Sequence, residues 1–139
     1  MKSKCQGVCR AVALLMMFFW FAPEIGAHSA PEQAVTFHGG VAKTTELFNL
    51  ELVIEDRRLR LFVRDRHNRP LDTGGSSVKA LAWGRGHSAE IGLRPGEHAT
   101  LVGEGEFQTF ALERVIVTLR MQEHEPVTAW FSGLSSKGS

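Results

Sequence analysis

The chain has 139 residues, 43% of them apolar, with 16 basic and 15 acidic side chains and six histidines. This length fits one domain with a core of its own, and a net charge of +1 excludes the basic footprint of a nucleic-acid-binding protein. The two cysteines, Cys5 and Cys9, both precede an apolar run near the N-terminus. Their position excludes a domain held together by disulfides.

Residues 1–27 are typical of a cleaved export signal. Lys2, Lys4 and Arg10 precede the apolar run at residues 11–22, which is too short to span a bilayer, since about 20 residues are needed. Cleavage after Ala27 leaves 112 residues with a net charge of −1, no cysteine and no stable membrane anchor. Cleavage after Ser29 is the alternative. The sequence therefore predicts a periplasmic protein.

After a flexible segment at residues 28–36, the domain is expected at residues 37–131, and its first clear feature is alternation of period two. Apolar residues at alternate positions, with polar residues between them, predict a β-hairpin with one side in water. The inward residues are Phe48, Leu50, Leu52, Ile54, Leu59, Leu61 and Val63. The outward residues are Asn49, Glu51, Val53, Arg58, Arg60, Phe62 and Arg64.

Further short strands follow a turn-rich connection at residues 65–75. They are expected at residues 78–83, 87–93, 98–102, 115–121 and 127–131. Residues 103–113 form an irregular crossing in which Phe107 and Phe110 fill the core, and residues 132–139 form a Gly/Ser tail. About seven strands with short turns predict an all-β fold, an immunoglobulin-like antiparallel β-sandwich. Trp83 and Trp130, near strand ends, are expected to cover the rim of the core.

No pattern in the chain indicates catalysis. The sequence contains no G-x-S-x-G elbow, no P-loop and no H-E-x-x-H pair, and no cysteine lies beyond the predicted signal. We therefore expect neither an enzyme nor an organic cofactor.

Three histidines are candidate metal ligands. His38 precedes Gly39 and Gly40. These glycines free the imidazole to project toward an ion, or let the chain pack closely against a neighbouring strand, or simply allow an edge strand to bend. His67 lies close to Asp65. Either its imidazole and the carboxylate bind a metal together, or Asp65 forms an Asx-type turn on which His67 is exposed. His28 adds an amine to its imidazole if it begins the exported chain.

The other histidines are expected at the surface. His87 and His98 open short strands and are predicted to be cross-strand neighbours, and His124 is solvated in a turn. A metal site would be assembled in space from His38 with His67 or His28. Because Met121 faces the core and no cysteine remains, divalent copper or zinc is the expected ion.

Several short motifs extend over residues 37–131. They are His38-Gly39-Gly40-Val41, Phe48-x-Leu50-Glu51-Leu52-Val53, Arg60-Leu61-Phe62-Val63-x-Asp65, Pro70-Leu71-Asp72 and Leu101-Val102-Gly103-Glu104-Gly105. With the export signal, they resemble a group of small bacterial periplasmic proteins. Similar His-Gly-Gly openings occur in the N-terminal region of periplasmic adaptor subunits of heavy-metal efflux pumps of the resistance-nodulation-division class. The resemblance implies a small sandwich domain and a link to metal export or tolerance. The histidine-rich stretch that relatives often carry after the signal is reduced here to His28.

Two hypotheses about function follow. The first is a periplasmic accessory protein that binds copper or zinc weakly and hands it over, since neutral imidazoles coordinate metal and release it on protonation. The second is a metal-free interaction module that docks onto an efflux adaptor or another envelope protein. Its contact surface would be an edge strand near Val41 or the face of Arg58, Arg60 and Arg64, which is otherwise an ordinary soluble face.

Overall fold

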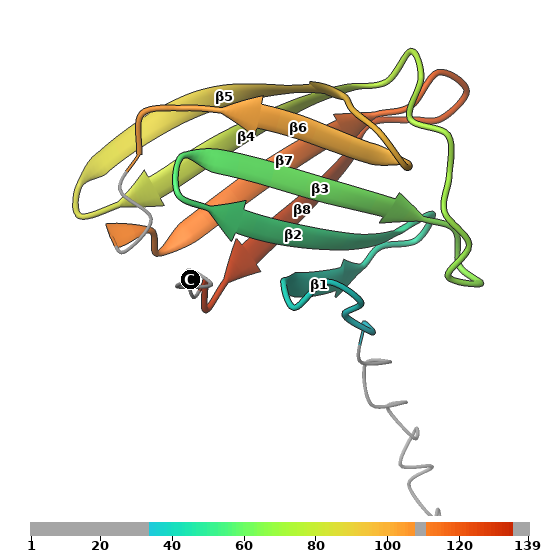
Figure 1. The fold of residues 1–139 in the computed structure, drawn as a ribbon, viewed down its shortest axis with the longest axis horizontal. Coiled ribbons are helices and arrows are strands. Elements are labelled where there is room, and N and C mark those ends of the chain that lie inside the picture. Colours follow the sequence, from blue (N-terminus) through green and yellow to red (C-terminus); the bar gives the residue numbers. More distant parts are fainter. Residues whose placement is uncertain (1–33, 108–110, 135–139) are drawn as a thin grey trace, which may run out of the picture.

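The structure, a computed structural model, describes residues 34–107 and 111–134. The predicted signal, His28 and the last five residues of the predicted tail lie outside these ranges, as does Phe110. The described residues contain eight β-strands and no α-helix (Figure 1). The strands are β1 (Val41–Thr44), β2 (Asn49–Glu55), β3 (Arg58–Arg64), β4 (Ser77–Gly84), β5 (His87–Pro95), β6 (Thr100–Glu104), β7 (Arg114–Arg120) and β8 (Val127–Ser132).

The eight strands form one antiparallel sheet in the order β1-β2-β3-β6-β5-β4-β7-β8. The sheet curls until its two edge strands, β1 and β8, approach one another across a groove of about 520 Å³. The all-β prediction is confirmed. The expected immunoglobulin-like sandwich of about seven strands is wrong, because the structure is barrel-like and β1 adds an eighth strand.

Strand β5 explains why the structure has one continuous sheet instead of the two sheets of the predicted sandwich. Its first seven residues, from His87 to Leu93, pair with β4, and its last two, Arg94 and Pro95, pair with β6. A strand that changes partner along its length joins the two halves of the sheet. Alternation of period two is the same in a sandwich and in a curled sheet, so the pattern alone does not distinguish them.

The core lies inside the curled sheet. The inward residues of β2 and β3 are buried as predicted, and they meet the inward residues of β4, β5, β6, β7 and β8, including Phe131. Phe107 packs against this core, as expected. Trp83 and Trp130 do not cover the rim of the core but point outward from the sheet, where they are 48% and 55% exposed.

The outward side of β2 and β3 differs from the prediction. Glu51 and Val53, expected in water, are buried, and so is Phe62 in β3. The cause is the segment before β1, which folds back over this part of the sheet. This covered area is the region in which His38 lies.

Substitutions at two glycines on adjacent strands test how tightly β5 and β6 pack at their junction. A Cβ on Gly103 would lie 2.7 Å from the carbonyl oxygen of Gly92 and 2.9 Å from Ile91 Cγ2, whereas a Cβ on Gly92 would meet nothing within 4 Å. We expect Gly103→Ala to lower the free energy of unfolding by about 1–3 kcal/mol, because the added methyl group overpacks the junction. Gly92→Ala, the matched control, should change it by less than about 0.5 kcal/mol. Urea denaturation followed by circular dichroism measures both, and equal losses in the two variants would contradict this account of the junction.

Candidate functional site

The most unusual side chain of the structure is the carboxylate of Glu51. It stands on the outward side of β2, yet Glu51 is only 2% exposed. Its Oε1 accepts hydrogen bonds from the backbone N–H groups of His38 (2.8 Å) and Gly40 (3.0 Å). Its Oε2 accepts one from the backbone N–H of Phe37 (3.0 Å). One carboxylate thus fastens the segment before β1 onto the sheet.

The His38 imidazole completes this arrangement. Its Nδ1 lies 3.0 Å from Oε2 of Glu51. Its ring stacks on Phe62 with a centroid separation of 3.6 Å and an interplanar angle of 7°. Glu51 and Phe62 are directly opposite one another in the pairing of β2 with β3, so the strand register places both contacts of the imidazole side by side. We call this unit the His38–Glu51 pair.

The two glycines after His38 allow the chain to reach the carboxylate. Gly39 has a φ of 75°, in the left-handed region that favours glycine. At Gly40 a Cβ would clash with the carbonyl oxygen of Leu52. The glycines therefore let the backbone pack closely against β2 before it enters β1, which was one of the alternatives that the sequence left open.

The hydrogen bonds decide the charge of Glu51 and the tautomer of His38. Burial raises the pKa of Glu51, but the backbone N–H groups of Phe37, Gly40 and His38 and the His38 side chain outweigh it, so the pKa lies below its ordinary value of 4.5. An ionised carboxylate only accepts hydrogen bonds, so Nδ1 of His38 carries the proton. In the neutral imidazole Nε2 then has a free lone pair, on a side chain that is 39% exposed.

His67 does not share such a carboxylate. Asp65 Oδ1 accepts from the backbone N–H groups of His67 (2.8 Å) and Arg69 (3.0 Å), and Asp65 Oδ2 lies 2.7 Å from Arg69 Nε. The hydrogen bond from the Arg69 backbone leads the contacts that hold the pKa of Asp65 below its ordinary value. The predicted Asx-type turn is thus the correct alternative, and His67 is exposed on it.

The structure separates the other histidines. His87 opens β5, whereas His98 lies in the turn beyond the other end of that strand with a φ of 54°, so the predicted cross-strand pair is wrong. His124 is exposed, as expected, and its ring packs edge-on against Phe48 with a centroid separation of 5.4 Å. Within residues 34–107 and 111–134, no three His, Cys, Asp or Glu side chains are grouped as a metal cluster.

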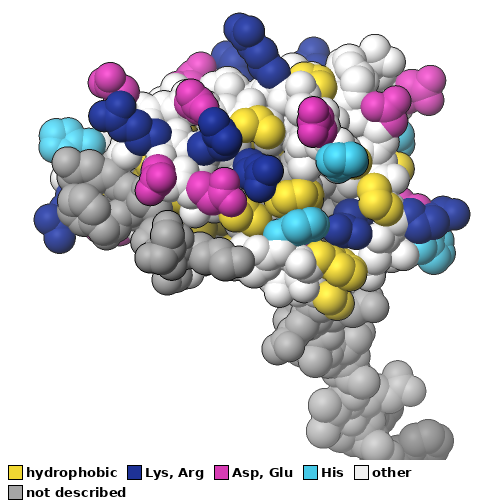
Figure 2. Space-filling view, in the orientation of Figure 1, with side chains coloured by type: hydrophobic (Ala, Val, Ile, Leu, Met, Phe, Trp, Pro, Cys, Tyr) yellow, Lys and Arg dark blue, Asp and Glu magenta, His cyan; other side chains and the backbone are white. Residues whose placement is uncertain are grey.

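The predicted arginine face is occupied by contacts within the chain. Arg58 pairs with Glu104 at 2.7 Å and Arg60 with Glu55 at 3.5 Å. The Arg64 guanidinium lies 4.0 Å from the centroid of the Phe37 ring. Figure 2 shows the result on this side of the molecule, where basic and acidic side chains are interspersed.

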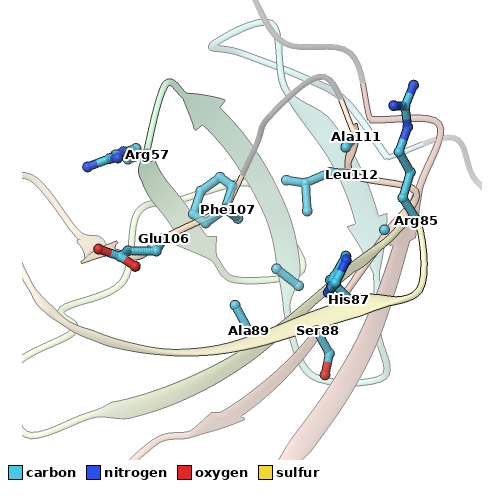
Figure 3. A pocket seen from close by; sticks show the side chains of 11 residues that line it. Arg57, Arg85, His87, Ser88, Ala89, Glu106, Phe107, Ala111 and Leu112 are labelled. Atoms are coloured by element: carbon cyan, nitrogen blue, oxygen red, sulfur yellow. The ribbon is translucent and has the colours of Figure 1, made fainter.

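A hollow of about 820 Å³ lies at the end of the sheet where β4 turns into β5. In Figure 3, Phe107 and Leu112 point toward one another across it, with Ala89 and His87 beside them. Arg57 and Arg85 point away from the space between the two apolar side chains. The space between these two side chains is therefore mainly apolar, and no function is assigned to it.

Comparison with protein-family models, with curated proteins and with solved structures finds no match to this chain. In the described residues, no helix has the length and apolar character required to cross a membrane. The function must therefore be inferred from the residues themselves, and the His38–Glu51 pair is the arrangement with the most defined chemistry.

Sequence reasoning identified His38 but missed Glu51. The available signal was a carboxylate between Leu50 and Leu52, inside a strand whose other residues are mostly apolar. A charge in such a strand is buried only with partners. The upstream pair of glycines, which lets backbone N–H groups approach, was the second half of that signal.

Because the pKa of Glu51 is lowered on folding, its contribution to stability is present above pH 4.5 and is lost as the pH falls through the folded-state value. We expect Glu51→Gln to lower the free energy of unfolding at pH 7 by about 1–3 kcal/mol, since buried N–H groups lose a charged acceptor. The wild type should also lose more stability than this variant between pH 5 and pH 3. Urea denaturation at each pH measures the difference.

Glu104→Gln is the control, because the ion pair that Glu104 forms with Arg58 is exposed and therefore screened by solvent. Parallel stability-versus-pH curves for the wild type and Glu51→Gln would show that the carboxylate does not fasten the segment.

Proposed function

We propose that this protein is an exported accessory protein that binds a divalent transition metal, copper or zinc, weakly and reversibly through Nε2 of His38. The observation that carries the proposal is the bond between His38 Nδ1 and the buried carboxylate of Glu51. Metal-binding histidines usually donate their second ring N–H to a carboxylate or carbonyl group, which fixes the tautomer and makes the ligand nitrogen more basic. The His38–Glu51 pair has this form.

The ring is also held in place before any ion arrives. Stacking on Phe62 and the bond to Glu51 fix the plane and the rotation of the imidazole. A ligand whose orientation is already set loses less conformational entropy on binding. Since 39% of the His38 side chain is exposed, an ion can reach it from solvent.

One imidazole gives weak binding, which suits transfer rather than storage. Zinc and copper sites in proteins generally use three or four ligands, and the described residues supply no grouped set around His38. The remaining positions would be filled by water, by His28 or by a ligand of a receiving protein. The link to heavy-metal efflux rests on the sequence resemblance, and the accessory role is proposed on the same basis.

Calorimetric titration of the exported protein with Cu²⁺ and Zn²⁺ at pH 7 tests the proposal. We expect a dissociation constant below about 1 mM, equivalent to about 4 kcal/mol of binding free energy. His38→Ala should abolish this binding, and Glu51→Gln should weaken it by about tenfold, the size of effect usual for removing the carboxylate behind a ligand. His87→Ala, which removes an exposed imidazole elsewhere, is the matched control and should change nothing.

Binding no tighter than millimolar, or binding that His38→Ala leaves unchanged, would contradict the proposal. Equal weakening by His87→Ala would show that the ion binds exposed imidazoles without preference.

Export and processing are part of the same proposal. We expect the intact mass of the exported protein to match a chain that begins at His28 or, with the alternative cleavage, at Ala30. A start at His28 provides an amine and an imidazole on one residue, so this form should bind Cu²⁺ more tightly than the shorter form. An intact mass that still includes residues 1–27 would contradict the cleaved signal.

A further inference from the structure

The outer face of β4, β7 and β8 carries an apolar row that the metal proposal does not use. Leu81, Ile116 and Trp130 are directly opposite one another across the three strands. In the next row, Trp83 is paired with Arg114. We call these five residues the tryptophan face. Its two indoles are 48% and 55% exposed, although every other outward residue of the three strands is smaller or charged.

Arg114 connects the two indoles. It is the strand partner of Trp83, and its guanidinium carbon lies 5.5 Å from the centroid of the Trp130 ring. A guanidinium over an indole is held by a cation–π interaction and keeps its N–H donors available for an anion. The tryptophan face therefore combines two amphipathic rings with a positioned donor group.

The outward positions of the strands that carry this face are positively charged. The outward positions of β4, β7 and β8 hold three cations, Lys79, Arg114 and Arg120, and no carboxylate. The neighbouring strand β5 supplies Glu90, which lies 3.5 Å from Lys79. Arg114 and Arg120 thus remain as unbalanced cations at the outward strand positions, while Glu113, Glu123 and Glu125 lie in the segments that flank β7 and β8.

The outward face of β2, β3 and β6, on the other side of the curled fold, does not have this excess of positive charge. The outward positions of β2, β3 and β6 hold three arginines and three glutamates, which are Arg58, Arg60, Arg64, Glu51, Glu55 and Glu104. Two of the arginines are paired with glutamates there. Exposed indoles and unbalanced positive charge therefore occur together at the outward positions of β4, β7 and β8. Both are absent from the outward positions of β2, β3 and β6.

We propose that the tryptophan face binds an anionic phospholipid surface, reversibly and without insertion of the chain. Indole rings favour the boundary between headgroups and acyl chains, because one end of the ring is apolar and its N–H bonds to polar groups. Guanidinium groups bind phosphate with paired hydrogen bonds, and anionic lipids attract basic residues.

Flotation with phospholipid vesicles tests this inference on the exported protein, after its N-terminus is established by intact mass. We expect the protein to float with vesicles of phosphatidylglycerol and phosphatidylcholine but not with phosphatidylcholine alone, and to be released by about 0.5 M NaCl, which shortens the range of electrostatic attraction. The chain has no tyrosine and only three tryptophans. With Trp20 removed, its fluorescence reports the tryptophan face alone and should shift to shorter wavelength on binding.

Two variants and their controls make the test specific. The double substitution Trp83→Ala/Trp130→Ala should abolish flotation, and Arg114→Glu should weaken it by about tenfold or more, because it reverses a charge near the lipid. Arg60→Glu, on the opposite side, and Val35→Ala, an exposed apolar residue outside the sheet, should float like the wild type. Circular dichroism checks that each variant is folded.

Failure to float with phosphatidylglycerol vesicles would overturn the inference, as would flotation that the double substitution leaves unchanged. Self-association in sedimentation velocity that the double substitution abolishes, without flotation, would show that the face contacts a second copy instead of lipid. None of these results depends on metal, so this inference and the metal proposal fail separately.

Discussion

The structure around the candidate site depends on one buried carboxylate. Glu51 stands on the outward side of β2, where a charge would normally meet water, and is instead covered by the segment that it binds. A buried charge requires partners, and here three backbone N–H groups and one imidazole provide them. The position of His38, the close approach at Gly40 and the start of β1 all follow from this requirement.

The sequence predicted much of the fold because one side of each strand is apolar. Alternation located seven of the eight strands to within a few residues, and the inward residues of β2 and β3 were identified correctly. It did not distinguish a sandwich from a curled sheet, since that choice depends on β5 pairing first with β4 and then with β6. Such pairing is a long-range property that period two does not encode. The edge strand expected near Val41 is β1, although it was not among the seven strands counted from the alternation.

The candidate site was predicted only in part, for a related reason. His38 with its two glycines was singled out, but its chemistry depends on Glu51 and Phe62, 13 and 24 residues further along the chain. Strand register brings these three side chains together. At His67, local hydrogen bonds decide the structure, and there the Asx-type turn considered from the sequence is what forms. Contacts within a few residues were thus predictable, whereas contacts across strands were not.

The central claim is that Glu51 keeps the proton of neutral His38 on Nδ1 and leaves Nε2 as the ligand nitrogen. Long-range ¹H–¹⁵N correlation NMR of the histidine rings measures this most directly, without metal and near neutral pH. The account predicts a protonated Nδ1 and an unprotonated Nε2 for His38, and a change of that pattern in Glu51→Gln. A proton on Nε2 of His38, or the averaged tautomers of an exposed imidazole, would contradict it.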